Sequence, residues 1–280
     1  MHENFLILLA GFWLAFAAIC DFRKREIPDW VSFSLVAFAL SYRAFVSIFY
    51  WQDFFTPGLI GLAVFFALGE GIYRIGFGGG DAKLLTALGS VVPFSFSFLE
   101  NIYLLGVFFV SLMFIGAGYS LLFSLAVALR GWKKFSMKLK QEFLKRKKCI
   151  LLLSPFFLIS LALAFFNALF LFASALLFIT PILLVYSKAV EELMVKEIKV
   201  GRLTIGDWLY ENVKVNRKII KPSTTGLNEK ELKILQNYKG KVKIKEGVPF
   251  TISFLLAFIF LVLWHSNRGF FNYYLGLFGL

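Results

Sequence analysis

The first polar cluster of this apolar sequence contains an aspartate, Asp21, directly after a run of apolar residues. We expect Asp21 at the C-terminus of a helix, where the negative end of the helix dipole disfavours a charged carboxylate. The basic residues that follow, Arg23, Lys24 and Arg25, would orient a membrane helix without it. Asp21 is therefore a candidate functional acid, although an ordinary ion pair with Arg23 or Arg25 would also explain it.

The second polar cluster is a glycine-rich stretch, residues 76–80, that ends at Asp81. Glycine adopts backbone angles closed to other residues and lets another chain approach closely. An apolar helix is predicted to begin here, which places Asp81 near a helix N-terminus. Aspartate is also common there as a structural N-cap. Neither glycine spacing of the phosphate-binding loops is present, and an acid would repel phosphate.

Two carboxyl groups sharing a site of low dielectric constant cannot both ionise cheaply, so one stays protonated beside one carboxylate. Such a pair can activate a water and polarise a peptide carbonyl, which is the requirement of aspartic proteolysis. Other chemistries have little support. The two histidines, His2 and His265, stand near the chain ends, and the two cysteines form no Cys-x-x-Cys pair.

The composition limits the classes of protein that this chain can be. Of 280 residues, 59% are hydrophobic, 36 are Phe and only 17% are charged. This composition excludes a soluble enzyme, a secreted disulfide scaffold and a disordered chain, because each needs a different content of hydrophobic, charged or cysteine residues. The net charge of +13 indicates basic cytoplasmic loops facing anionic membrane lipid, and not nucleic-acid binding. We predict a polytopic α-helical membrane protein, with about 6–8 transmembrane helices and a small α+β cytoplasmic insert.

Apolar runs long enough to cross a bilayer occur at roughly 4–20, 30–50, 57–75, 84–99, 101–129 and 248–264. The run at 150–187 is interpreted as two short helices that turn near Asn167. The expected organisation is membrane catalytic helices over 1–130, a basic cytoplasmic loop or surface helix over 131–149, a membrane hairpin over 150–187, a small cytoplasmic domain over 188–247, and a final transmembrane helix and tail over 248–280.

The basic segments predict the orientation of the chain. Residues 130–148 hold nine Lys or Arg against one acid, and assigning such segments to the cytoplasm puts the N-terminus outside and both aspartates on the cytoplasmic side. Arg43 falls in the outer half of its run, and we expect its side chain to extend to the lipid headgroups. In the insert, residues 241–245 alternate as a strand does, and Asn228 with Glu231 suits a capped helix start.

These two clusters resemble the two signatures of the type IV prepilin peptidases, which are membrane-embedded GxGD aspartic proteases. The first signature is matched by Asp21, Arg23, Arg25, Ile27, Pro28 and Asp29. The second, 60 residues further on, is matched by Gly78, Gly80, Asp81, Lys83, Leu84 and Gly89. The resemblance covers residues 1–130 well. The paired cysteines of the bacterial enzymes are missing, so methyltransferase activity is not carried over, and residues 245–250 resemble the archaeal branch.

The resemblance implies that Asp21 and Asp81 are the catalytic pair, one acting as base and one as acid, with no cofactor or metal. It leaves open which does which. Gly78 and Gly80 would let the Asp81 segment move or let the substrate backbone approach. Lys83 would either orient an aspartate or anchor its helix in the headgroups. Arg25 and Pro28 support the first motif.

The implied substrates are precursor archaellins or type IV pilin-like proteins, cut at the cytoplasmic face of the cell membrane. Their basic leader could be recognised by Glu26, Asp29 or Glu70. Each has a plainer interpretation, because Glu26 and Asp29 neighbour bases and Glu70 stands four residues before Arg74. Two alternatives stay open, a transporter whose acids and glycines line an ion path and a non-catalytic membrane scaffold. The oligomeric state is not predicted.

Overall fold

The computed structural model describes residues 2–215, 218–236, 238 and 240–267. The chain divides into two compact units. The first is built from residues within 1–121 and 198–280, and the second is residues 122–197. The division falls inside helix α5 (Phe98–Arg130) and strand β1 (Val195–Lys199).

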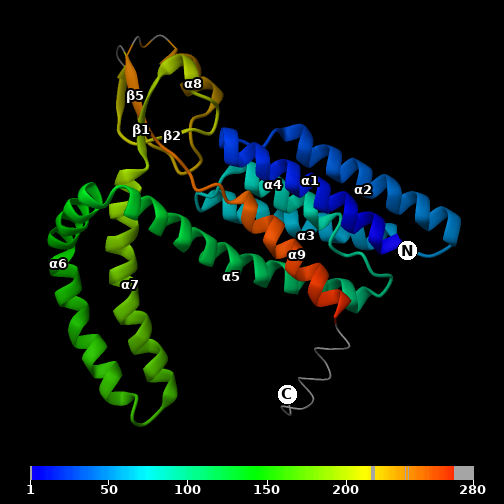
Figure 1. Ribbon diagram of the computed structural model, residues 1–280, viewed down its shortest axis with the longest axis horizontal. Coiled ribbons are helices and arrows are strands. Elements are labelled where there is room, and N and C mark those ends of the chain that lie inside the picture. The colour runs from blue at the N-terminus through cyan, green and yellow to red at the C-terminus, as the bar shows by residue number, and fades with distance from the viewer. Residues whose placement is uncertain (1, 216–217, 237, 239, 268–280) are drawn as a thin grey trace. The chain divides into compact units, whose positions relative to one another are not determined.

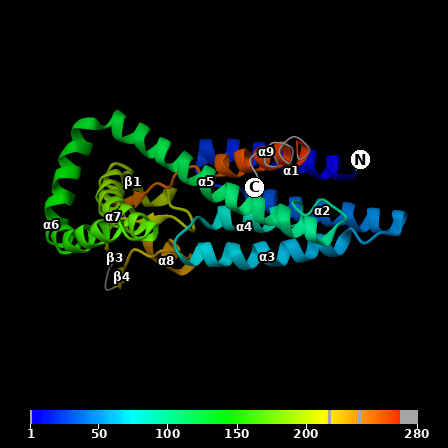
Figure 2. The ribbon, with the colours of Figure 1, turned by 90° about the horizontal axis from the view of Figure 1, so that it is seen from below.

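Within the described residues, five helices are long and apolar enough to cross a membrane. They are α1 (His2–Lys24), α2 (Asp29–Tyr50), α3 (Phe55–Arg74), α5 and α7 (Ala168–Leu193). The predicted multi-pass helical class is confirmed. The count differs from the expected 6–8 because α9 (Thr251–Ser266) is apolar but short and the first half of α6 (Trp132–Leu163) is basic. Helix α9 packs along α1 (Figures 1 and 2).

The prediction of a crossing helix over 84–99 is wrong. Helix α4 (Gly79–Gly89) has 11 residues, and the chain continues as an irregular segment that is buried over 90–95. Arg43 does not extend to the headgroups either, because its side chain is 0% exposed. Its guanidinium donates four hydrogen bonds, of 2.6–3.1 Å, to the carbonyls of Phe54, Ser90, Val91 and Pro93.

Both corrections have one physical reason. Backbone carbonyls beyond the end of a helix have no partner within it, and inside an apolar bundle there is no water to bind them. A hydrogen-bond donor from the protein must therefore satisfy them. Arg43 supplies that donor to the residues after α4, and this allows α4 to end where it does. The guanidinium also lies 4.5 Å from the ring centroid of Phe54, a favourable cation–π distance.

Helix α4 packs against α3 with the two backbones in contact. A Cβ placed on Gly61 of α3 would lie 2.2 Å from the carbonyl oxygen of Gly89, and one on Gly69 would lie 2.8 Å from that of Ala82. Small residues at matched positions allow this approach, which gives helices in a membrane their van der Waals contact. The pair fixes the axial position of α4, and with it the position of Asp81.

The small sheet region lies between α7 and α9 in the sequence. The strands β1, β5 (Lys241–Lys245) and β2 (Trp208–Leu209) form one sheet in the order β1-β5-β2. A separate hairpin pairs β3 (Val213–Val215) with β4 (Lys218–Ile220), and the remaining elements are a short 3₁₀ turn, η1 (Val200–Arg202), and α8 (Glu229–Leu235). The predicted strand at 241–245 and the capping box of Asn228 and Glu231 are both confirmed.

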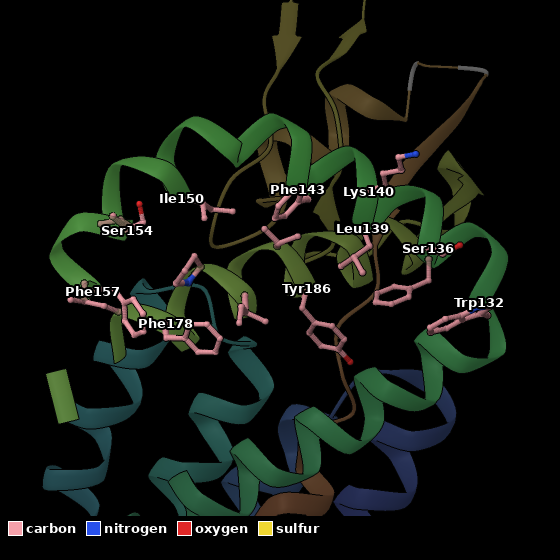
Figure 3. Close-up of a pocket in the computed structure, with 16 residues that line it drawn as sticks. Trp132, Ser136, Leu139, Lys140, Phe143, Ile150, Ser154, Phe157, Phe178 and Tyr186 are labelled. Carbon is pink, nitrogen blue, oxygen red and sulfur yellow. The ribbon is translucent and has the colours of Figure 1, made fainter. Parts of the chain in front are cut away.

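The second unit is a helical hairpin of α6 and α7 (Figure 1). It turns near Asn167, as predicted, and the Asn167 side chain accepts a hydrogen bond from the Leu169 N–H at 2.9 Å. Between the two helices lies a groove of about 750 Å³ with a mostly apolar lining (Figure 3). Lys140, Ser136 and Ser154 are the polar side chains of α6 that line it.

Candidate active site

Asp21 and Asp81 lie on adjacent helix ends of the first unit. Asp21 occupies the last turns of α1 and is 8% exposed, and Asp81 occupies the first turn of α4. Asp81 belongs to none of the long crossing helices. Burial, and secondly the nearby charge of Asp21, raise the pKa of Asp81 to about 8. The raised pKa favours the protonated form of Asp81 beside the Asp21 carboxyl group.

The simpler structural interpretation of Asp81 is not supported. The N-cap of α4 is Gly78, which has extended backbone angles and no side chain to cap with. A Cβ on Gly78 would lie 3.0 Å from Oδ2 of Asp81. Glycine at this position thus leaves the Asp81 carboxyl room that any side chain would reduce.

The two motifs meet where Gly80 faces the connection between α1 and α2. A Cβ on Gly80 would lie 3.3 Å from Cβ of Ile27. The next residue, Pro28, is the N-cap of α2 with φ −60° and ψ 133°, angles that proline favours. The backbone therefore turns sharply between Asp21 and α2, and Gly80 allows α4 to pack against that turn.

An ion pair joins the motifs at the surface. Lys83 Nζ lies 2.6 Å from Oδ1 of Asp29, and both side chains are about half exposed. The acid that Lys83 orients is thus Asp29, and neither Asp21 nor Asp81. The pair connects the N-terminal parts of α4 and α2.

A third segment completes the site, and sequence reasoning missed its principal residue, Thr251. The backbone N–H of Thr251, the first residue of α9, donates to Oδ2 of Asp21 at 3.1 Å. Arg25, which directly follows α1 and has a positive φ of 59°, reaches the same segment through a 3.4 Å hydrogen bond from Nη1 to the carbonyl of Gly247. The signal in the sequence was the stretch at 245–250, which resembled the archaeal branch without indicating a role.

The three acids considered for leader recognition all have partners. Glu26 accepts a 2.7 Å hydrogen bond from Oγ1 of Thr204 in the insert, and Asp29 pairs with Lys83. Glu70 forms a 2.9 Å ion pair with Arg74, four residues on, as its plainer interpretation predicted. Glu26 and Asp29 are exposed and flank the turn that follows Asp21, whereas Glu70 is engaged within its own helix.

The arrangement suits acid–base chemistry on a peptide bond. The raised pKa of Asp81 favours its protonated form, Asp21 accepts a backbone N–H, and both residues lie at the start or end of a helix. In the part of the chain that the structure describes, no group of three or more His, Cys, Asp or Glu side chains could hold a metal ion. The groove of the second unit is lined by neither aspartate.

Comparison with known proteins agrees with these motifs. Residues 8–132 match the type IV leader peptidase family, Peptidase_A24. A preflagellin peptidase of Methanocaldococcus jannaschii is 37% identical over 91 residues, which is 32% of this chain and 38% of that protein. A preflagellin peptidase of Methanococcus maripaludis is 32% identical over 87 residues, 31% of this chain and 38% of that protein.

The chain thus spans little more than a third of the length of either relative, and no solved structure matches it significantly. Both aspartates and the glycine contacts described above lie inside the matched stretch. Over residues 8–132, the chain is similar to the type IV leader peptidase family.

Proposed function

We propose that this protein is a membrane-embedded aspartic endopeptidase that removes the N-terminal leader of archaeal preflagellins and prepilins. The observation that carries the proposal is the interacting pair of carboxyl groups, Asp21 and Asp81, at adjacent helix ends inside the matched family region. The relatives that match are named preflagellin peptidases, which supports this substrate class.

In the proposed mechanism Asp21 is the base and Asp81 is the acid. The Asp21 carboxylate removes a proton from a water whose oxygen attacks the scissile carbonyl carbon, while the Asp81 carboxyl gives its proton to the carbonyl oxygen. A tetrahedral diol results. When it collapses, the C–N bond breaks, Asp21 returns its proton to the leaving amine, and Asp81 recovers its proton from the diol. The division of roles follows from the raised pKa of Asp81.

The proposed site lies at the cytoplasmic face of the cell membrane, with the N-terminus outside. The basic residues 23–25 directly after Asp21 support this orientation. A substrate would present a short basic leader to this face and a hydrophobic helix to the bilayer. Exposed Glu26 and Asp29, on the turn beside Asp21, are the carboxylates best placed to attract that leader.

Anionic membrane lipid is the second proposed partner, through the α6–α7 hairpin. Five exposed lysines on the basic half of α6 have no carboxylate partner among the described residues, and Lys140 also lines the apolar groove (Figure 3). A groove of this volume suits a small apolar ligand such as an acyl chain, and the lysines suit a phosphate headgroup. The unpaired lysines are Lys133, Lys134, Lys140, Lys147 and Lys148.

Lipid retention tests this partner. Native mass spectrometry of the purified protein should show bound phosphatidylglycerol in preference to phosphatidylcholine, and Lys140→Gln should reduce that retention several-fold. Lys134→Gln removes the same charge outside the groove and is the matched control. Equal retention of both lipids, or equal effects of the two variants, would contradict the proposal.

The peptidase activity is tested by cleavage of a preflagellin with the detergent-solubilised full chain. Asp21→Asn and Asp81→Asn should each lower the cleavage rate by about 10³-fold or more, because each removes one half of an acid–base pair. Asp53→Asn is the matched control, since Asp53 accepts the Thr56 N–H in the first turn of α3 and asparagine can replace it there.

Unchanged melting temperatures would separate loss of chemistry from loss of fold. Cleavage that survives in either variant would exclude the aspartate pair. A wild-type chain that cleaves no preflagellin or prepilin would favour the transporter or scaffold alternatives, neither of which needs both carboxyl groups for turnover.

A further inference from the structure

Thr251 contacts both halves of the candidate site and has no role in the mechanism above. It is the first residue of α9, and its side chain and backbone are 0% exposed. Its N–H binds Asp21, while its hydroxyl lies on the Asp81 side. There the hydroxyl lowers the pKa of Asp81, against the larger raising effects of burial and of Asp21.

The hydroxyl of Thr251 is nevertheless not satisfied. Oγ1 is buried and has no partner with full hydrogen-bond geometry in the described structure. An unsatisfied buried hydroxyl costs free energy, so it gains stability from an acceptor that comes within reach. Here the group beside it is a carboxyl that must change its protonation state during the proposed reaction.

The position of Thr251 is fixed by the residue before it. The ring of Phe250 packs edge-on against Phe77, at 5.7 Å between centroids, and against Phe254 at 5.8 Å. Gly116 of α5 makes room for that ring, because a Cβ there would lie 2.4 Å from Phe250 Cζ. Phe77 directly precedes the N-cap of α4, so the start of α9 and the start of α4 are packed together.

We propose that Thr251 is the positioning residue of the aspartate pair: its N–H holds Asp21, and its hydroxyl donates a hydrogen bond to Asp81 when Asp81 gives up its proton. This inference rests on the proposed peptidase function and deepens it. It assigns α9 a part in the reaction beyond its place in the bundle.

The donation has a specific chemical consequence. A hydroxyl that donates to a carboxylate stabilises the ionised form of Asp81, which exists only after the acid has protonated the substrate carbonyl. The interaction is therefore stronger during the reaction than before it, and such interactions raise kcat. The other charged and titratable groups beside the pair are Arg25, which directly follows α1, and Tyr119 of α5.

Thr251→Val tests the proposal, because valine keeps the shape and the N–H and removes the hydroxyl. We expect kcat for preflagellin cleavage to fall about 10- to 100-fold. The alkaline limb of the pH–rate profile should move up by about half to one pH unit, since Asp81 would then lose its proton less readily. Thr251→Ser, which restores the hydroxyl, should recover kcat to within about threefold and return the limb to its original pH.

Ser253→Ala is the matched control. Ser253 lies on the same helix, is also 0% exposed, and also has a buried hydroxyl without a partner in the described structure. Its removal should change neither kcat nor the pH profile. Thr251→Ala provides a second variant without the hydroxyl in case the valine variant folds poorly, and it should shift the limb in the same direction.

The outcomes separate this inference from the proposed function. A wild-type rate and pH profile in Thr251→Val, or a slower rate with an unmoved alkaline limb, would overturn the role of Thr251 while Asp21→Asn and Asp81→Asn remain inactive. Cleavage by the Asp21→Asn or Asp81→Asn protein would overturn the proposed function itself. The two failures therefore cannot be confused.

Discussion

The two ends of helix α4 are built in opposite ways. At its C-terminus, Arg43 donates hydrogen bonds to carbonyls beyond the last turn, and the backbone of Gly89 touches that of Gly61. At its N-terminus, a glycine caps the helix, and an exposed ion pair between Lys83 and Asp29 joins it to the neighbouring turn. Asp81 belongs to the second, more lightly held end.

The difference suggests how a short helix can carry a reactive group. A buried charge and a backbone contact fix the axial position of α4 from the end where no chemistry is expected. The glycine end then leaves space for a substrate backbone or for small movements of the Asp81 carboxyl. A helix held tightly at both ends would leave no such space, and one held loosely at both would not align its carboxyl with Asp21.

The largest effect on stability is expected for Arg43→Leu. Leucine can fill part of the space but leaves four buried carbonyls without donors, and each unsatisfied group is costly. We expect a loss of about 3 kcal/mol or more in the free energy of unfolding, measured by thermal melting in detergent. Arg74→Leu, which removes an exposed i,i+4 pair, should cost less than about 0.5 kcal/mol.

Equal melting temperatures for Arg43→Leu and Arg74→Leu would break the comparison. That result would mean that water or another side chain satisfies the carbonyls after α4. The melting temperature of Arg43→Lys should lie between those of the wild type and Arg43→Leu, because an ammonium has three donors where the guanidinium has five.

The next largest effect is expected for Gly89→Ala. Its added Cβ would lie 2.3 Å from the carbonyl oxygen of Gly61, a backbone atom that cannot rotate away. Separating α3 and α4 should cost about 1–3 kcal/mol in the same melting experiment. At the other end, an added Cβ on Gly80 would lie 3.3 Å from Cβ of Ile27, a much milder contact, so Gly80→Ala should cost less than about 1 kcal/mol.

Gly71→Ala controls for helix propensity, because Gly71 lies on α3 with no atom within 4 Å of an added Cβ. It should be neutral or slightly stabilising. If Gly80→Ala destabilises the protein as much as Gly89→Ala does, the two ends of α4 are equally closely packed, and the proposed difference between them is wrong.

The two ends also differ in how far the sequence predicts them. The motif end was predicted because its residues break local rules: an acid at a helix C-terminus, and glycines before an acid. The buried end was missed because Arg43 looks, in a single sequence, like any basic residue near a membrane surface. Three of its four partners are backbone carbonyls 47–50 residues away, and every residue has a carbonyl, so residue types do not reveal them.

Hydropathy had a similar limit. Residues 84–99 are apolar enough for a crossing helix, yet apolar composition does not distinguish a helix from an irregular segment buried by its neighbours. Thr251 was not predicted as a site residue for another reason. Its contact with Asp21 is made by a backbone N–H, which every residue except proline possesses. The turn at Asn167 and the capping box at Asn228 were predictable, since each depends on a local side-chain bond.

The pH dependence of cleavage tests the glycine end directly. The pKa of Asp81 is raised to about 8 by burial and by Asp21, so the proton it must donate is present below that pH and lost above it. The rate should therefore fall about tenfold per pH unit above pH 8, equivalent to about 1.4 kcal/mol per unit. A steady-state profile in detergent from pH 6 to 9.5 measures this, and a rate that stays level to pH 9.5 would contradict the acid role of Asp81.

The smallest effect on stability is expected for the ion pair that joins the two motifs. Lys83→Met keeps most of the side-chain length and removes the charge facing Asp29, and both groups are about half exposed, so the loss should be about 0.2–1 kcal/mol. The double variant Lys83→Met with Asp29→Asn should cost little more than either single variant, because one interaction is removed in all three. A loss above about 2 kcal/mol would show that the lightly held end depends on its surface charges as strongly as the buried end depends on Arg43, and the contrast between the two ends of α4 would then disappear.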